Sequence, residues 1–340
     1  MKRSNVGLDA VAAWDNLTAA FLRAARGKAR RPDVLGFRAR LLRELAALRG
    51  GILDLSVGVG ATSQFMVFDP KRRVIHAPVF RERVLHHALI RQIGPSLDAV
   101  QIDESFACRK GKGALAAVRC VQAHLRRSPW YLQLDMRRYF DSIAHERLRL
   151  LLRRRLKNRG TLALLDRIVA CYQSDASTPR CARGVPIGAL TSQYFANLYL
   201  AGFDRWLLAL PGVVGVVRYM DDVLAFCADR ATARQLPAAC GEYLDRELAL
   251  CLRLARVQPT RHGVRFCGYR VLPRALRLST RRRRRYAAAR RAAEQSYLAG
   301  RIDARQLQVA YQAALAATMH ADALAYRRAE LVRHPGLVDA

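Results

Sequence analysis

Two adjacent aspartates, Asp221 and Asp222, stand between two apolar runs at residues 213–219 and 223–227. Their charges repel each other and burial penalises each one, so such a pair is costly unless it binds cations. A third acid, Asp135, ends another short apolar run. Three carboxylates at strand ends could hold two magnesium ions, one activating a hydroxyl nucleophile and the other stabilising a leaving pyrophosphate. The acids therefore predict a metal-dependent active site.

The charge balance indicates a polyanionic partner. The chain of 340 residues carries 59 basic and 27 acidic residues, for a net charge of +32. Nucleic acid is the usual partner of such an excess, and the basic residues run through the whole chain, which disfavours a membrane surface. No apolar stretch reaches the ~18–20 residues that span a bilayer, and the N-terminus lacks the apolar core of a signal peptide. We therefore expect a cytoplasmic protein with no membrane partner.

The cysteines and histidines show no familiar metal-binding spacing. The eight cysteines are spread singly, without a Cys-x-x-Cys pair, and the eight histidines contain no His-x-x-x-His pair. This pattern argues against a zinc site and against a disulfide framework. It favours free thiols in a reducing compartment.

The remaining pattern predicts the elements that position the acids. Apolar residues recur at helical spacing over about 8–50, around a basic loop at 26–32, and Gly50-Gly51 closes this region. Further helices are predicted at about 80–100, 113–127, 144–172, 191–209 and 230–250, and from 280 nearly to the end. Strands are predicted within 63–75, at 131–134, at 266–272, and in the two runs around Asp221 and Asp222, which form a hairpin. Helices and strands interleave, which predicts an α+β fold whose lobes share one groove.

Five ordered motifs resemble the reverse transcriptase family. The string Tyr219-Met220-Asp221-Asp222 looks like the catalytic hairpin of these enzymes. The stretch 134–143, Leu-Asp-Met-Arg-Arg-Tyr-Phe-Asp-Ser-Ile, looks like their first catalytic strand and the turn after it. Three further segments also match. Residues 70–89 resemble the fingers, residues 106–114 resemble the loop after the fingers, and residues 266–269 resemble the primer-grip hairpin. The resemblance covers about residues 60–275 and is far more specific than an Asp-Asp pair alone.

The resemblance implies an α+β right-hand polymerase fold, with fingers, a palm of antiparallel sheet and helices, and a helical thumb. The implied parts are a helical N-terminal extension at 1–60, fingers at 61–130, a palm at 131–272 with a finger-like helical insertion at about 144–183, and a basic helical thumb at 273–340. The implied activity is RNA-directed DNA synthesis by a two-metal mechanism with Mg²⁺, for which Mn²⁺ could substitute. The implied ligands are template RNA, complementary DNA (cDNA) and deoxynucleoside triphosphates.

The resemblance also implies roles for single residues. Asp135, Asp221 and Asp222 would be the catalytic carboxylates, and with Met136 they would form the metal site. Phe140 matches the aromatic residue under the incoming sugar, where a flat ring would exclude a 2′-hydroxyl. The implied nucleotide contacts are Lys71, Arg73, Arg137, Arg138, Tyr139, Phe140, Ile187, Gly188 and Gln193. The implied nucleic-acid contacts are Arg109, Lys110, Tyr219, Met220, Gly268, Tyr269, Arg281, Arg282 and Arg283.

Plainer interpretations of some of these residues stay open. Phe140 is alternatively a core residue, and Lys71 with Arg73 a solvated basic turn. The run Arg281–Arg285 would contact phosphates regardless of sequence, or form a charged face in solvent.

One segment resembles a particular branch of the family. Most reverse transcriptases carry Gln-Gly where this chain has Ile187-Gly188, and Ser-Pro where it has Ser192-Gln193. This form looks like the polymerases of diversity-generating retroelements, which copy a template RNA with errors concentrated at adenines. The branch implies mutagenic retrohoming in bacteria or phages, and a small basic ring-forming accessory variability protein as partner. Ile187 cannot hydrogen-bond the nascent pair, so it would lower fidelity; the alternative is a packing change without kinetic effect.

One position departs from the family pattern. Relatives usually place near Cys251 a lysine that would protonate the leaving pyrophosphate, whereas here the nearby basic residue is Arg253. Arginine is a poor acid, because its pKa stays above ~12. Either another group serves, or catalysis is slow, or the correspondence is shifted by two residues. The rival readings are another short bacterial reverse transcriptase, defence-associated or intron-like, and a catalytically weak nucleic-acid-binding scaffold.

Overall fold

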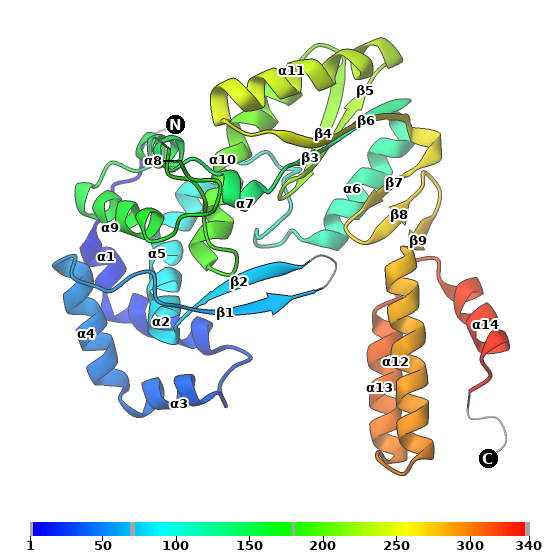
Figure 1. Ribbon diagram of the computed structural model, residues 1–340, viewed down its shortest axis with the longest axis horizontal. Helices are drawn as coiled ribbons and strands as arrows, with labels where there is room; N and C mark the ends of the chain where they lie inside the picture. Colours follow the sequence, from blue (N-terminus) through cyan, green and yellow to red (C-terminus); the bar gives the residue numbers. More distant parts are fainter. Residues whose placement is uncertain (1–2, 69–71, 179–180, 337–340) are drawn as a thin grey trace. The chain divides into compact units, whose positions relative to one another are not determined.

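The computed structural model describes residues 3–68, 72–178 and 181–336 (Figure 1). The chain divides into two compact units, and each is built from three separate segments. Unit 1 comprises residues 1–103, 135–207 and 238–254, and unit 2 comprises 104–134, 208–237 and 255–340. Helices and antiparallel strands occur in both units, so the predicted α+β class is confirmed. Within the described ranges, no helix has the length and apolar character needed to cross a bilayer.

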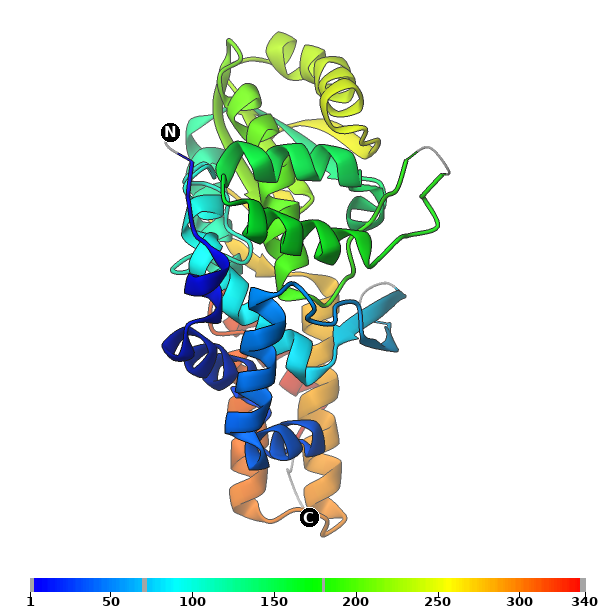
Figure 2. The same cartoon turned by 90° about the vertical axis from the view of Figure 1, so that its left-hand side faces the viewer.

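Unit 1 opens with helices that pack around one long helix. These helices are α1 (Leu8–Ala12), α2 (Trp14–Ala25), α3 (Pro32–Ala39), α4 (Leu41–Leu53) and α5 (Phe80–Asp98). The rings of Phe21, Phe37 and Phe80 join α2, α3 and α5, with centroids 5.1–6.1 Å apart. Figure 2 shows the blue N-terminal helices beside α5. The predicted end at Gly50-Gly51 is wrong, because α4 continues for two more residues and buries Ile52 completely.

The rest of unit 1 is a hairpin and a further set of helices. Strands β1 (Thr62–Val67) and β2 (Arg73–Pro78) pair antiparallel. The helices are α7 (Tyr139–Ser142), α8 (His145–Arg155), α9 (Arg159–Ala170), α10 (Leu190–Leu208) and the second half of α11 (Arg230–Leu248). The helical region predicted at 144–172 is split, because the side chain of Asn158 accepts a hydrogen bond from the Thr161 N–H and starts α9.

Unit 2 is built on an antiparallel hairpin within a four-stranded sheet. The strands are β3 (Trp130–Met136), β4 (Val213–Tyr219), β5 (Asp222–Cys227) and β6 (Leu252–Pro259), in the order β4-β5-β3-β6. Strand β6 was not predicted from the sequence, in which 252–257 reads Leu-Arg-Leu-Ala-Arg-Val. The first half of α11 also belongs to this unit.

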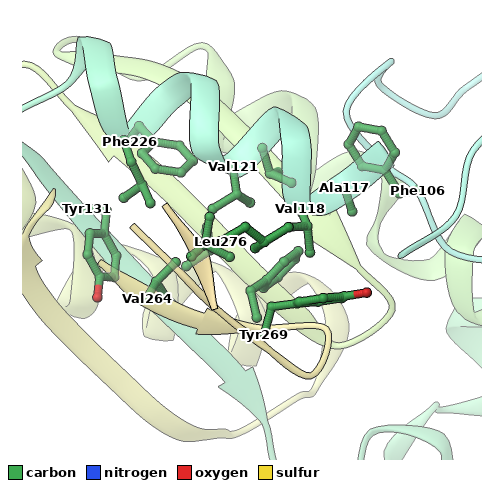
Figure 3. Close-up of a cluster of buried hydrophobic side chains, with 14 of the residues drawn as sticks. Phe106, Ala117, Val118, Val121, Tyr131, Phe226, Val264, Tyr269 and Leu276 are labelled. Atoms are coloured by element: carbon green, nitrogen blue, oxygen red, sulfur yellow. The ribbon is translucent and has the colours of Figure 1, made fainter. Parts of the chain in front are cut away.

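Helix α6 (Ala114–Arg127) covers the hydrophobic core of unit 2 (Figure 3). Its Val118 and Val121 are fully buried and belong to one cluster with Tyr131, Phe226 and Tyr269. The cluster therefore includes side chains from the four-stranded sheet and from a second, three-stranded sheet. That second sheet is β7 (Val264–Phe266), β8 (Tyr269–Val271) and β9 (Leu276–Leu278), and the short η1 (Thr260–His262) precedes it.

The C-terminal part of unit 2 is helical, as predicted. It comprises α12 (Thr280–Leu298), α13 (Ala304–Ala316) and α14 (Leu324–Arg333), and Figure 1 shows α12 and α13 lying side by side. Asp303 forms a capping box with Gln306 at the start of α13. A buried pair, Arg290 and Glu294, is joined at 2.8 Å, and Tyr311 of α13 donates to the same Glu294 carboxylate. These contacts satisfy polar groups inside the α12–α13 pair.

Candidate active site

The two adjacent aspartates lie at the tip of a tight hairpin, as predicted. Tyr219 of β4 is paired with Asp222 of β5, so Met220 and Asp221 form a two-residue loop. Such loops require backbone with φ above zero, and Met220 has φ of 58°. A side chain in this left-handed region costs about 1–2 kcal/mol. The turn that displays the acids is therefore held in a strained conformation by the strands on either side.

A buried arginine stabilises this turn through a hydrogen bond to its backbone. Arg218 is completely buried, and its Nη1 donates to the carbonyl oxygen of Met220 at 3.2 Å. Its backbone N–H donates to the Glu104 carbonyl, and its own carbonyl accepts from the Phe106 N–H. The sequence analysis missed Arg218. Its only signal was a charged residue inside a run of valines.

A side-chain hydrogen bond links Asp222 to the neighbouring strand. Gln133 of β3 donates from Nε2 to Asp222 Oδ1 at 3.2 Å and to the Arg265 carbonyl at 3.3 Å. Asp135 follows Gln133 by two residues on the same strand, and alternate residues of a strand face the same side. Gln133 was also missed, since its partner is 89 residues away in sequence.

In unit 1, Asp135 is paired with an arginine. Arg253 Nη2 donates to Asp135 Oδ2, and the Asp135 side chain is 21% exposed. The neighbouring Cys251 accepts a hydrogen bond from the Arg137 N–H through its carbonyl, at 2.9 Å. The Met136 side chain is buried, so its main-chain carbonyl is the group that could reach a ligand. Arg253, which the sequence analysis noted near Cys251, thus contacts a predicted catalytic acid.

The residues after Asp135 are placed by the short α7. Arg138 has φ of 45°, and its guanidinium pairs with Asp141 at 3.0 Å and Asp175 at 3.6 Å. Tyr139 is buried and donates to the Ala196 carbonyl. The partly buried Phe140 ring meets Tyr139 edge-on, with centroids 5.8 Å apart. Phe140 is therefore partly exposed, whereas Tyr139 is buried.

The loop at 187–188 lies against the β1–β2 hairpin of unit 1. The His76 N–H of β2 donates to the Ile187 carbonyl at 2.7 Å. Gly188 has φ of +125°, and a Cβ there would lie 2.7 Å from the His76 carbonyl oxygen. Arg73, at the start of β2, is exposed, and Gln193 lies partly buried on α10. These predicted nucleotide contacts all belong to unit 1, and Lys71 lies outside the described residues.

A cavity of about 300 Å³ adjoins this loop in unit 1. Its lining includes His76, Glu82 and Thr191, and also His86, whose buried ring nitrogens make no hydrogen bond. The Glu82 carboxylate accepts from two backbone N–H groups at 2.9 Å. On the same helix, burial and then the nearby positive charges lower the pKa of His87 to about 4. The ring of His87 is therefore neutral in the folded protein at ordinary pH.

Some of the predicted nucleic-acid contacts in unit 2 are buried, and others are exposed. Tyr269 is buried; Arg282 lies 4.1 Å above its ring and donates to its hydroxyl at 2.7 Å. Arg283 lies over the Tyr326 ring at 5.2 Å. Arg281, Lys110 and Gly268 are exposed, and Gly268 has φ of 78°. Arg109 donates a hydrogen bond to the Ser105 carbonyl at 2.8 Å. Several arginines of the basic run therefore serve packing as well as charge.

Comparison with known proteins identifies relatives. Residues 69–271, more than half of the chain, match the family "reverse transcriptase (RNA-dependent DNA polymerase)". YkfC of Escherichia coli K12 is 27% identical over 143 residues, which are 40% of this chain and 38% of YkfC. The group II intron-encoded protein LtrA of Lactococcus lactis subsp. cremoris is 23% identical over 141 residues, which are 41% of this chain and 24% of LtrA. The chain thus spans well under half the length of these curated relatives.

Among solved structures, telomerase from Candida tropicalis with a fragment of telomeric RNA aligns at 9% identity. The alignment covers 80% of this chain and 54% of that one, with a TM-score of 0.49. The family match and the distant relation to group II intron-encoded proteins confirm the right-hand polymerase fold that the sequence motifs implied.

Proposed function

The chain belongs to the reverse transcriptase family, and from this membership we propose that it copies an RNA template into DNA. The observation that carries the proposal is the hairpin turn at Met220-Asp221, which displays two acids inside the region that matches the family. The net charge of +32 supports nucleic acid as ligand. Template RNA, cDNA and deoxynucleoside triphosphates are the proposed ligands.

We assign the metal-holding role to Asp135, Asp221 and Asp222. The donor set fits, because carboxylate oxygens are the ligands that Mg²⁺ prefers and Mn²⁺ accepts. The strand order supports it, since Asp135 is the penultimate residue of β3 and Asp222 the first residue of β5, the next strand of the sheet. Two Mg²⁺ ions bound there would activate the primer hydroxyl and stabilise the leaving pyrophosphate. Met136 would contribute through its carbonyl only.

The chain's own residues would orient the substrates around these acids. Phe140, which is partly exposed, would lie under the deoxyribose and exclude a 2′-hydroxyl. Arg73, together with Lys71, would neutralise the triphosphate, since exposed cationic donors form strong hydrogen bonds with phosphate. Arg253 holds Asp135 in the free chain and would compete with a cation for that carboxylate.

The proposed parts follow the sequence motifs. They are an N-terminal extension at 1–60, fingers at 61–130, a palm at 131–272 with a helical insertion at about 144–183, and a thumb at 273–340. In the proposed thumb, exposed arginines of α12 would contact phosphates, whereas Arg282 fixes the helix to β8 through Tyr269.

The direct test is primer extension on an RNA template with magnesium. Asp221→Asn should lose extension by several orders of magnitude. The matched control is Asp229→Asn, another acid of unit 2, which caps α11 through Thr232 and keeps its acceptor oxygen as asparagine. The control should extend normally. Equal extension by Asp221→Asn and the unmodified chain would refute the polymerase and favour a catalytically weak binding scaffold.

We further propose that the enzyme makes error-prone cDNA for a diversity-generating retroelement, with a basic ring-forming accessory protein. The support is Ile187-Gly188 followed by Ser192-Gln193, and the contact that seats Ile187 against β2 at 2.7 Å. An apolar Ile187 side chain offers no hydrogen bond to the nascent pair, which would loosen its selection.

Sequencing of the cDNA tests this finer proposal. Ile187→Gln should lower misincorporation opposite adenine, whereas Leu35→Gln, at an exposed position of α3 in the same unit, should not change it. An unchanged error pattern in Ile187→Gln would reject the role of Ile187. A gene neighbourhood with no near-identical repeats differing at adenines would favour the rival, another short bacterial reverse transcriptase.

A further inference from the structure

Glu104, Cys120 and His124 of unit 2 form a cluster of potential metal ligands outside the proposed active site. Glu104 Oε1 lies 2.9 Å from His124 Nε2 and 3.3 Å from Cys120 Sγ. One ligand atom from each residue lies within 4.8 Å of the other two. Residues four apart on a helix share one face, so α6 presents the cysteine and the histidine together. The local signal for this cluster is the Cys-x-x-x-His spacing within a helix.

The distances suit a zinc ion. Zinc binds sulfur at about 2.3 Å and nitrogen or oxygen at about 2.0–2.2 Å, so tetrahedral ligand atoms stand about 3.3–3.7 Å apart. The two distances from Glu104 are already close to these separations, and a small opening of the cluster would admit the ion. Thiolate, imidazole and carboxylate are each ligands that zinc binds, whereas Mg²⁺ prefers oxygen alone.

The histidine ring is held in place by its surroundings. His124 stacks on Phe226 with centroids 4.6 Å apart and an interplanar angle of 14°. On the adjacent strand a Cβ at Gly215 would lie 2.2 Å from the His124 Cε1 atom, so only glycine leaves room for the ring there. The Val216 N–H donates to the Glu104 carboxylate. Such fixed orientation of ligands lowers the cost of binding a metal.

The cluster is also open enough for a metal and a water molecule to enter. The side chains of His124 and Glu104 are 17% and 35% exposed. We propose that Glu104, Cys120 and His124 bind one zinc ion, with water as the fourth ligand. Bound there, zinc joins α6 to the Glu104 backbone, which is hydrogen-bonded to Arg218 below the Met220 turn. The site lies outside the proposed active site, and metal binding there can be measured without polymerase activity.

Metal analysis of the full chain, purified without a histidine tag, tests the proposal. After dialysis against buffer with trace zinc, the unmodified chain should hold about one zinc per chain. Cys120→Ser and His124→Gln should hold little. Cys108→Ser removes an exposed cysteine of the same unit outside the cluster and should retain the metal. Equal zinc content in all four proteins, or none in the unmodified chain, would overturn the proposal.

A spectroscopic readout separates ligation from folding. Cobalt(II) added to the metal-free chain should give a thiolate charge-transfer band, and Cys120→Ser should lack the band while Cys108→Ser keeps it. Glu104→Gln retains the thiolate and should weaken binding without abolishing the band. Added zinc should raise the melting temperature of the unmodified chain but not of His124→Gln. A cobalt complex without the thiolate band would reject Cys120 as a ligand.

Discussion

Replacing Gly188 by alanine should destabilise unit 1 and displace the loop that carries Ile187. The φ of Gly188 is +125°, a region that side chains rarely adopt. The added Cβ would stand 2.7 Å from the His76 carbonyl oxygen. Because that oxygen belongs to the backbone of β2, no change of rotamer can relieve the overlap.

The size of the effect follows from these two contacts. An unfavourable backbone conformation costs about 1–3 kcal/mol. Moving the loop away from His76 weakens its hydrogen bond to the Ile187 carbonyl, which contributes about 1 kcal/mol net. The sum is about 2–4 kcal/mol. For a unit of this size, 1 kcal/mol lowers the melting temperature by about 2–4 °C, so we expect a loss of roughly 4–16 °C.

Differential scanning calorimetry of the full chain measures this loss. The control is Gly36→Ala, in the interior of α3, where a Cβ meets nothing within 4 Å and φ is not positive. Alanine favours helix there and should stabilise the chain by about 0.5–1 kcal/mol. The two glycine-to-alanine changes should thus have opposite signs. A Gly188→Ala protein that melts at or above the unmodified temperature would contradict the strain argument.

Further outcomes follow from single contacts. Burial lowers the pKa of His87 to about 4, so between pH 4 and 6.5 the unfolded chain binds a proton that the folded chain does not. The free energy of unfolding should therefore be highest above about pH 6.5 and fall as the pH drops from 6.5 to 4. Urea midpoints at pH 7.5 and 5 measure this difference, and His87→Asn should reduce it. Arg253→Gln should lower the Mg²⁺ concentration for half-maximal extension by up to about fivefold, because it removes the cation paired with Asp135. The control is Arg246→Gln, at an exposed arginine of the same unit. Matching Mg²⁺ titrations of the two variants would show that Arg253 does not compete with Mg²⁺ for Asp135. Phe140→Val should raise ribonucleotide incorporation roughly tenfold in single-nucleotide assays, and an unchanged ratio would leave Phe140 a packing residue.

The parts of the structure that the sequence predicts are those set by local pattern. The hairpin around Asp221 and Asp222 is predictable because two apolar runs meet at a turn of fixed length. Strand β6 is not predictable from local pattern, because Arg253 and Arg256 stand three residues apart and the segment lacks a regular alternation of apolar and polar residues. The helix through Gly50-Gly51 was misjudged because burial of Ile52 outweighs the low helix propensity of glycine.

The features that the sequence does not predict depend on contacts between residues that are far apart in the chain. Gln133 reaches Asp222, and Arg253 reaches Asp135 across 118 residues. The cluster on α6 needs Glu104, which stands sixteen residues before Cys120 in the chain. Side-chain partners of this kind follow from how strands are ordered in a sheet, and no local spacing records that order.

The division of both units into three chain segments has a consequence for synthesis on the ribosome. The core of unit 2 includes Phe226 of β5 but also Val264, Tyr269 and Leu278 from the third segment. The hairpin bearing Asp221 and Asp222 therefore emerges before the side chains that complete its core. At about 5–20 residues per second this interval lasts on the order of several seconds. During that time the apolar side chains of the hairpin lack part of their core, and such exposed apolar surface is where chaperones bind nascent chains.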